Sequence, residues 1–280
     1  MNFSIIGPTG YIGKRHLEAI EHHDGSVISY LDINKSIELQ NSKYFKDQNE
    51  FFDSFDNLKP DYCVICSPNY LHFSQVIASL EKNVNVICEK PLCISNLELS
   101  KLISAEDKSL ASIFSIMQLR LHPVTKRLRN ISLNNNSKKT AEIRIVTPRD
   151  KSYLESWKVK KVYSGGILFN LGIHYFDLLI NAFGDVLHTE IDINEQLKSS
   201  GKTAFKDLEV DWFFSIDPDD QGPDLKPMRT FKINNEEINF HKVSNDLHYD
   251  NYDSIFNNSE LFDLPSVLPI MRYICEINEK

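Results

Sequence analysis

The stretch that decides the fold is Gly7-Pro8-Thr9-Gly10-Tyr11-Ile12-Gly13, which follows the apolar run at residues 3–6 directly. The apolar run predicts a strand, and apolar residues at helical spacing predict a helix over residues 10–21. Glycines between a strand and a helix let the backbone approach a pyrophosphate, which the helix N-terminus attracts. Gly10 and Gly13 match the last two glycines of the G-x-G-x-x-G dinucleotide fingerprint. The first glycine lies one residue too early, so a slightly wider turn is expected.

Asp32 follows the second predicted strand, residues 27–31, at about the 20-residue separation expected for a ribose-binding acid. A carboxylate there accepts hydrogen bonds from both ribose hydroxyls and repels a 2′-phosphate, which favours NAD over NADP. The alternative is an ordinary glycine turn in which Asp32 caps the next helix. The residues expected to contact NAD are Gly7, Thr9, Gly10, Tyr11, Ile12, Asp32, Ser67, Asn69, His72, Glu89, Lys90 and Gln118.

The first 120 residues alternate between short apolar runs and helical patterns. Strands are predicted over residues 3–6, 27–31, 61–67, 84–88 and 113–119, with helices over 10–21, 72–82 and 96–104. Alternating strands and helices predict an α/β fold, here a Rossmann domain over residues 1–120 with a parallel sheet.

Residues 121–280 show a different pattern, with several strands and little helix between them. Strands are predicted over residues 139–147, 186–194, 208–216, 229–233 and 237–243, with helices over 166–183 and 266–277. This pattern predicts a second, α+β domain with a large, mainly antiparallel sheet, and the last helix is a candidate to pack back on the Rossmann domain.

Composition narrows the class of protein. The formal net charge of −8 over 280 residues disfavours nucleic acids and membrane surfaces as partners. No stretch approaches the roughly 20 apolar residues of a membrane helix, and residues 1–7 do not resemble a signal peptide. The odd count of five cysteines favours reduced thiols in the cytoplasm. Cys63 and Cys66 should face opposite sides of a strand, so no metal site is expected.

Two clusters are candidates for catalysis. Lys90 follows the strand at residues 84–88 and therefore sits at the carboxyl edge of the sheet, where ligands bind. The second cluster is Asn170, His174 and Asp177, whose spacing of i, i+4 and i+7 places them on one helix face. A histidine beside an amide and a carboxylate is a good acid/base candidate. The alternatives are a solvated lysine and a structural histidine.

Four segments together resemble the Gfo/Idh/MocA (glucose-fructose oxidoreductase type) family. They are the glycine turn with Arg15-His16, Cys66-Ser67-Pro68-Asn69-Tyr70-Leu71-His72, Glu89-Lys90-Pro91, and residues 170–174. The resemblance implies a Rossmann domain plus a C-terminal domain whose open sheet forms homo-oligomers, tetramers or dimers. It also implies that Lys90 and His174 frame the substrate hydroxyl. Many relatives have an aspartate at the position of Asn170, and an amide cannot accept a proton as that carboxylate can.

Within the family, the chain resembles the branch of nucleotide-sugar 3-dehydrogenases of lipopolysaccharide O-antigen synthesis. The expected reaction is NAD-dependent oxidation of the 3-hydroxyl of a UDP-N-acetylaminoglucuronic-acid-type sugar, with a keto acid such as 2-oxoglutarate as a second partner. The alternatives are another sugar or inositol as substrate, or a non-catalytic NAD-binding regulator. The expected substrate-binding residues are Lys90, Arg120, Arg149, Trp157, Lys158, Asn170, His174 and Asp177, with His248 and Tyr252 as weaker candidates.

Overall fold

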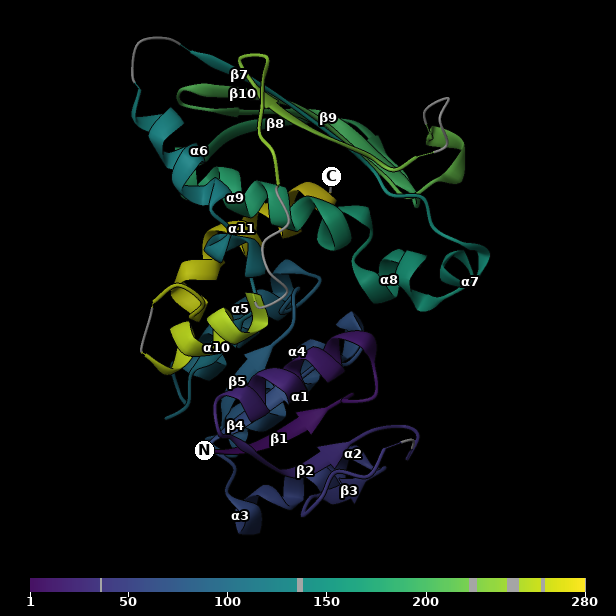
Figure 1. Ribbon diagram of the computed structural model, residues 1–280, viewed down its shortest axis with the longest axis vertical. Coiled ribbons are helices and arrows are strands. Elements are labelled where there is room, and N and C mark those ends of the chain that lie inside the picture. Colours follow the sequence, from purple (N-terminus) through teal and green to yellow (C-terminus); the bar gives the residue numbers. More distant parts are fainter. Residues whose placement is uncertain (36, 135–137, 222–225, 241–246, 258–259, 280) are drawn as a thin grey trace. The chain divides into compact units, whose positions relative to one another are not determined.

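The computed structural model describes residues 1–35, 37–134, 138–221, 226–240, 247–257 and 260–279, which form two compact units (Figure 1). Unit 1 comprises Met1–Gln118 and Ser244–Leu268, and unit 2 comprises Leu119–Val243 and Pro269–Lys280. The sequence prediction placed residues 244–268 in the second domain, whereas the structure groups them with the first.

Unit 1 contains a six-stranded sheet in the order β3-β2-β1-β4-β5-β6, in which every pair of neighbours is parallel. The strands are β1 (Asn2–Ile6), β2 (Ser26–Leu31), β3 (Lys43–Phe45), β4 (Tyr62–Ile65), β5 (Asn85–Cys88) and β6 (Ile113–Ser115). The predicted parallel sheet is therefore confirmed. The strand order reverses between β1 and β4, and ligands bind beyond the carboxyl ends of strands at such a point.

Helices pack on the sheet of unit 1. They are α1 (Tyr11–His22), α2 (Gln48–Asp53), α3 (Phe55–Leu58), α4 (Asn69–Glu81), α5 (Asn96–Glu106) and α10 (Leu247–Phe256). The prediction missed β3, α2 and α3, where a cluster of aromatic rings builds the edge of the sheet. Phe51 is fully buried there, with ring centroids 5.0 Å from Phe55 and 5.7 Å from Phe45. The strand predicted over 113–119 ends at Ser115.

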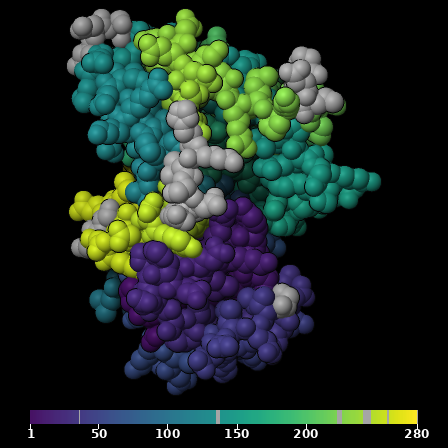
Figure 2. Space-filling view, in the orientation of Figure 1, coloured from purple at the N-terminus to yellow at the C-terminus, as the bar shows by residue number. Residues whose placement is uncertain are grey.

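Helix α10 is the element that brings the second segment of the chain into unit 1, because it packs along α1. His22 on α1 stacks on Tyr249 at 4.3 Å between ring centroids, and His23 Nε2 lies 3.0 Å from the backbone oxygen of Tyr249. Figure 2 shows yellow atoms of this late segment against purple atoms of the N-terminal part. Residues 226 positions apart in the chain are therefore in contact within one unit.

Unit 2 contains a second six-stranded sheet, in the order β12-β11-β7-β10-β9-β8. The strands are β7 (Lys139–Val146), β8 (Val186–Asn194), β9 (Lys198–Phe205), β10 (Leu208–Ser215), β11 (Met228–Ile233) and β12 (Glu236–Glu237). Only the β7–β10 pair is parallel, so the predicted mainly antiparallel sheet is confirmed. The prediction missed β9 and extended β12 to residue 243, and residues 241–243 lie outside the described chain.

The longer helices of unit 2 lie on one face of this sheet (Figure 1). The helical elements are η1 (Gln118–Leu121), α6 (Val124–Leu133), α7 (Lys151–Leu154), η2 (Trp157–Val159), α8 (Lys161–Ser164), η3 (Leu168–Gly172), α9 (Ile173–Phe183), η4 (Pro218–Asp220) and α11 (Leu264–Glu279). Phe176 of α9 and Trp212 of β10 are both fully buried, with ring centroids 5.5 Å apart. Helix α11 crosses the division between the units at Pro269. The other face of the sheet exposes charged side chains, among them Glu209 and Asp211.

One segment, Lys161–Phe183, has the length and mean hydropathy of a membrane span, which differs from the sequence expectation. Buried residues make up 56% of its apolar window, as in the core helix of a folded domain. The backbone also has φ of 80° at Gly165 and 91° at Gly166, which breaks the helix there. Length and composition alone therefore do not distinguish this core segment from a span.

Gly201 in the middle of β9 allows an unusually close approach of two strands and offers a test of the sheet. A β-carbon at this position would clash with the backbone oxygen of Glu190 and lie 2.7 Å from the Trp212 ring. Gly201→Ala should therefore destabilise the protein by about 1–3 kcal/mol, measured by urea unfolding. Lys202→Ala, at an exposed neighbouring position, should change stability by no more than about 0.5 kcal/mol. Equal stability of the two variants would contradict this packing.

Candidate active site

The glycine turn places the start of α1 at the carboxyl edge of the sheet. Gly7 has a φ of 74°, its N–H donates to Leu31 O at 2.9 Å, and its oxygen accepts from Gly10 N at 3.2 Å. A β-carbon on Gly13 would clash with the oxygen of Gly7 and lie 2.7 Å from Pro8 Cα, so only glycine allows α1 to pack this closely. The turn thus exposes the first N–H groups of α1 next to the β1–β4 switch point.

Asp32 lies against this turn. Its Oδ2 accepts hydrogen bonds from Thr9 N at 3.2 Å and Thr9 Oγ1 at 2.8 Å, and its Oδ1 accepts from Asn34 N at 3.3 Å. A carboxylate has about four acceptor sites, so capacity remains for ribose hydroxyls. A glycine cradle, a helix N-terminus and an acid at the end of β2 together fit an NAD molecule.

Other predicted cofactor contacts have defined partners in unit 1. Ser67 Oγ donates to Gln75 Oε1 at 2.6 Å, and Asn69 begins α4. His72 is buried, and its two ring nitrogens each lie 2.7 Å from a backbone oxygen, those of Ser67 and Pro91. Burial lowers the pKa of His72. The hydrogen bonds to the two carbonyl oxygens favour the charged ring and oppose this shift, but the effect of burial is larger. His72 therefore links the loop after β4 to the residue that follows Lys90.

Lys90 follows β5 and is half-buried, and the Lys90–Pro91 peptide bond is cis. Its backbone N–H donates to Glu89 Oε2 at 3.3 Å. The structure thus places Lys90 at the carboxyl edge of the parallel sheet, where the sequence predicted it. Gln118, the last predicted cofactor contact, is half-buried at the start of η1.

The helix face predicted for Asn170, His174 and Asp177 is altered by a π-helical turn. This turn spans Leu168–Gly172, so α-helical spacing does not hold across it. Asn170 Nδ2 donates to Lys158 O at 3.1 Å, and both Asn170 and His174 are half-buried. Asp177 is fully buried, because it pairs with an arginine instead of facing solvent.

Arg120 and Asp177, both predicted to bind substrate, form a buried two-point ion pair within unit 2. Arg120 Nη2 donates to Asp177 Oδ1 at 2.6 Å, and Arg120 Nε donates to Oδ2 at 2.9 Å. Their side chains are 3% and 2% exposed. The pair joins η1 to α9 and holds the helix one turn beyond His174, which favours a structural role for both residues.

Two of the other predicted substrate contacts gather around one ring. Arg149 Cζ lies 4.9 Å and Lys158 Nζ 5.2 Å from the centroid of Tyr153. Arg149 Nε is buried without a hydrogen-bond partner among the described residues. Trp157 is half-buried in η2, next to Lys158. Two cations next to one aromatic ring make this segment suitable for an anionic group.

The sequence prediction missed the surroundings of Glu89. His16, from α1, and His248, from α10, both lie within 4 Å of its carboxylate, and all three side chains belong to unit 1. His248 and Tyr252 were candidates for the substrate side, whereas both are buried in unit 1. The Arg15-His16 pair in the resemblance to the family was the one available signal.

The fold and the turn define an NAD-binding oxidoreductase. The profile described as "Oxidoreductase family, NAD-binding Rossmann fold" matches residues 1–115, and that described as "Oxidoreductase family, C-terminal alpha/beta domain" matches residues 139–220. The two profiles together span well over half of the chain. The chain belongs to the Gfo/Idh/MocA oxidoreductase family, and its cofactor is NAD.

Solved structures cover nearly the whole chain. The WlbA (WbpB) dehydrogenase from Thermus thermophilus, crystallised with NAD and alpha-ketoglutarate, is 30% identical with a TM-score of 0.91, covering 99% of this chain and 94% of that one. The WlbA (WbpB) dehydrogenase from the same organism in complex with NAD and UDP-GlcNAcA gives 29% identity, a TM-score of 0.90 and the same coverage.

Curated relatives match smaller portions. Myo-inositol 2-dehydrogenase from Thermotoga maritima is 26% identical over 194 residues, which are 66% of this chain and 55% of that protein. Glucose-6-phosphate 3-dehydrogenase from Bacillus subtilis is 23% identical over 71% of this chain and 58% of that protein. The chain thus spans less than two thirds of the length of these curated relatives.

Substitutions at Gly10 and Gly13 test cofactor binding and folding separately. A β-carbon on Gly10 would meet only the oxygen of Gly7, at 3.4 Å, which is ordinary contact, whereas one on Gly13 would clash with backbone. Gly10→Ala should therefore keep the melting temperature and weaken NAD binding, because the methyl group occupies the pyrophosphate approach. Gly13→Ala should lower stability by about 1–3 kcal/mol. Calorimetric titration and thermal melts check both, and unchanged NAD affinity in Gly10→Ala would contradict the site.

Asp177→Asn tests whether the Arg120–Asp177 pair is structural. Removing one member of a buried ion pair should destabilise the protein by about 3–5 kcal/mol, because the remaining charge is buried without compensation. The double variant Arg120→Met/Asp177→Leu should recover much of that loss, since no charge remains buried. Urea unfolding measures all three proteins. Wild-type stability of Asp177→Asn together with weaker substrate binding would instead assign the pair to the substrate.

Proposed function

We propose that the protein oxidises the 3-hydroxyl of a UDP-N-acetylaminoglucuronic-acid-type sugar to the 3-keto sugar, with NAD as hydride acceptor. The observation that carries this proposal is the likeness, over 99% of the chain, to the WlbA (WbpB) dehydrogenase, whose structures contain NAD with UDP-GlcNAcA or with alpha-ketoglutarate. Glucose-6-phosphate 3-dehydrogenase, which resembles the chain more distantly, is also named for a 3-position.

Oxidation of a secondary alcohol requires removal of a hydride and a proton from the same carbon centre. Bound NAD supplies the hydride acceptor. We assign removal of the hydroxyl proton to His174, which is half-buried on α9, and a hydrogen bond to the developing alkoxide to Lys90. A positioned ammonium stabilises negative charge on oxygen, and a neutral imidazole accepts a proton near neutral pH.

Asn170 and the cations near Tyr153 are proposed to bind the substrate. An amide accepts no proton, so Asn170 takes part as a hydrogen-bonding residue that orients a sugar hydroxyl, while its Nδ2 holds Lys158 O. Arg149 and Lys158 suit a carboxylate or a diphosphate, because both are cations next to the same Tyr153 ring of unit 2. Trp157 next to them offers an apolar ring surface.

Further parts of the proposal concern partners and location. A keto acid such as 2-oxoglutarate is proposed to reoxidise NADH, by analogy with the alpha-ketoglutarate in the Thermus thermophilus structure. The sheet of unit 2 has a face without covering helices in the described chain. We propose that this face forms the interface of a homo-oligomer, a tetramer or a dimer.

Five free cysteines favour a reducing compartment, and we propose the cytoplasm. We also propose a role in lipopolysaccharide O-antigen synthesis, because the chain resembles that branch of the family.

A second candidate function is the NAD-dependent oxidation of another sugar or of an inositol. It is favoured by the relatives named for myo-inositol and glucose 6-phosphate. A panel of UDP-sugars, free aldoses, sugar phosphates and inositols, scored by NADH formation, decides between them. The proposal predicts the highest kcat/KM for the UDP-sugar acid. Preference for inositol or a sugar phosphate would replace the proposed substrate, and tight NAD binding without turnover on any sugar would indicate a regulator.

Lys90→Ala and His174→Ala should each lower kcat by about 10²–10⁴-fold, because each removes a group proposed to act on the reacting hydroxyl. The dissociation constant of NAD should change little in both variants. Lys158→Ala serves as a comparison, since loss of a substrate-binding charge should raise KM more than it lowers kcat. Stopped-flow and steady-state measurements of NADH formation check these values, and near-normal kcat in either of the first two variants would refute the assignment.

A further inference from the structure

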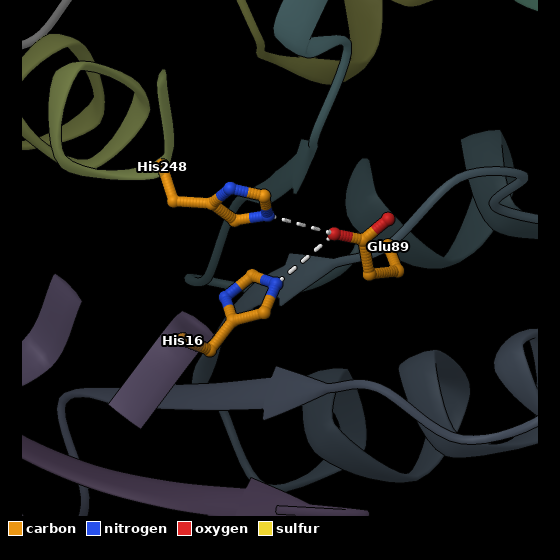
Figure 3. Close-up of side chains that lie close together, drawn as sticks. All are labelled: His16, Glu89 and His248. Atoms are coloured by element: carbon orange, nitrogen blue, oxygen red, sulfur yellow. Dashed lines mark hydrogen bonds and ion pairs between the residues drawn. The ribbon is translucent and has the colours of Figure 1, made fainter. Parts of the chain in front are cut away.

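Two buried histidines, from the separate helices α1 and α10 of unit 1, converge on one carboxylate oxygen of Glu89. His16 Nε2 lies 3.1 Å from Glu89 Oε1, and His248 Nε2 lies 3.6 Å from the same atom. The exposed fractions of the three side chains are 0% for His16, 5% for His248 and 14% for Glu89. Figure 3 shows both imidazole rings pointing toward that oxygen of Glu89.

His16 is fixed at both ring nitrogens. Its Nδ1 lies 2.8 Å from the hydroxyl of Tyr252, which is fully buried on α10. Burial lowers the pKa of His16 and favours a neutral ring, which carries one N–H. Only the tautomer with the hydrogen on Nε2 donates to Glu89, because a lone pair there would face the carboxylate. Tyr252 then donates to Nδ1, and a chain of two hydrogen bonds ends on Glu89.

His248 completes the surroundings of the carboxylate. Its ring packs edge-on against that of His16, with centroids 5.3 Å apart, and among the described residues its Nε2 has no hydrogen-bond partner. The atom is therefore oriented toward Glu89 Oε1 without another group to satisfy it. Burial opposes the charge on Glu89, but the hydrogen bond from His16 and the nearby His248 outweigh it and hold the pKa of Glu89 below its usual range.

The second oxygen of this carboxylate contacts the proposed catalytic lysine through the backbone. Glu89 Oε2 accepts from Lys90 N at 3.3 Å, so one carboxylate links α1 and α10 to the end of β5. We propose that Glu89 is a positioning residue, held by His16 and His248, that fixes the Glu89–Lys90 backbone and thereby the direction of the Lys90 side chain. This inference rests on the proposed function, in which Lys90 contacts the reacting oxygen.

Two histidines and a carboxylate within 4.8 Å of one another are also a set that binds divalent metals. A metal requires the lone pair of His16 Nε2, whereas the carboxylate 3.1 Å away favours a hydrogen on Nε2. The Tyr252 hydroxyl can donate to Nδ1 in that tautomer. The hydrogen-bonded arrangement is thus favoured over a metal centre, and metal content is one readout of the test.

The network is tested first without substrate. Histidine-selective ¹⁵N NMR of the whole protein at pH 8, assigned by comparison with His16→Gln, should show His16 with its proton on Nε2. Elemental analysis of the purified protein should show no stoichiometric zinc or iron. A proton on Nδ1, or one equivalent of metal that is lost in His248→Gln, would overturn the hydrogen-bonded arrangement.

The positioning role is tested by kinetics with a matched control. Glu89→Gln and His248→Gln should each lower kcat by about 10- to 100-fold, as expected for a small displacement of a catalytic group. The dissociation constant of NAD should stay within about twofold, because the glycine turn is intact. His23→Gln is the control, since His23 also joins α1 to α10, through Tyr249 O, without touching Glu89. It should lower the melting temperature at most and keep kcat.

The outcomes separate this inference from the proposed function. The kinetics use whichever sugar the wild-type protein oxidises fastest, so a change of substrate leaves the test intact. A wild-type protein that oxidises no sugar refutes the proposed function and with it the role of Glu89 in catalysis, while the NMR result still decides the network. Unchanged kcat in Glu89→Gln, or an equal loss of kcat in His23→Gln, would overturn the positioning role.

Discussion

The close approach of α1 to the turn after β1 is the constraint on which the rest of unit 1 depends. Gly13 has no side chain, so the helix begins directly over the carbonyl oxygen of Gly7. Its N-terminus then lies at the switch point of the sheet, where a dinucleotide phosphate is attracted. The same placement sets the position of His16, one turn further along α1. One backbone contact thus determines both the cofactor cradle and the histidine against Glu89.

The corresponding constraint in unit 2 is a buried ion pair. The buried Arg120–Asp177 pair joins the chain after β6 to α9, the helix that carries His174. A buried pair adds little net stability, because both groups lose their hydration. The pair instead orients α9, because a contact at two points fixes the rotation of the helix about its axis. A largely buried carboxylate is thus held next to each proposed catalytic side chain: histidines contact Glu89, which precedes Lys90, and Arg120 pairs with Asp177, one turn beyond His174.

The sequence allowed the architecture to be predicted where local pattern and burial agree. The parallel sheet of unit 1, the mainly antiparallel sheet of unit 2 and the positions of Gly7 and Lys90 follow from apolar runs and turn residues. Strand β9 was missed because Lys198–Phe205 is polar and contains Gly201, so its strand character comes from its neighbours β8 and β10. The short elements between residues 43 and 58 were missed because packing of phenylalanine rings determines them.

Prediction of the site from the sequence was also limited, because long-range contacts determine part of it. Residue type and spacing made Lys90, His174 and Asp32 candidates, but they do not show which charged groups pair. Arg120 and Asp177 are 57 residues apart and satisfy each other, and His248 reaches Glu89 only because α10 returns to α1. The π-helical turn at Leu168–Gly172 also changed the face on which Asn170 lies. Long-range pairings and backbone irregularities of this kind have no local sequence signal.

Transfer of hydrogen from C3 of the sugar to NAD is the central claim, and an isotope label tests it directly. The purified protein is incubated with NAD and the UDP-sugar acid carrying deuterium at C3, and the NADH is analysed by mass spectrometry. The account predicts that the NADH carries the deuterium, and that added 2-oxoglutarate receives it in turn. Unlabelled NADH from the C3-deuterated sugar would contradict the account, because the hydride would then come from another carbon.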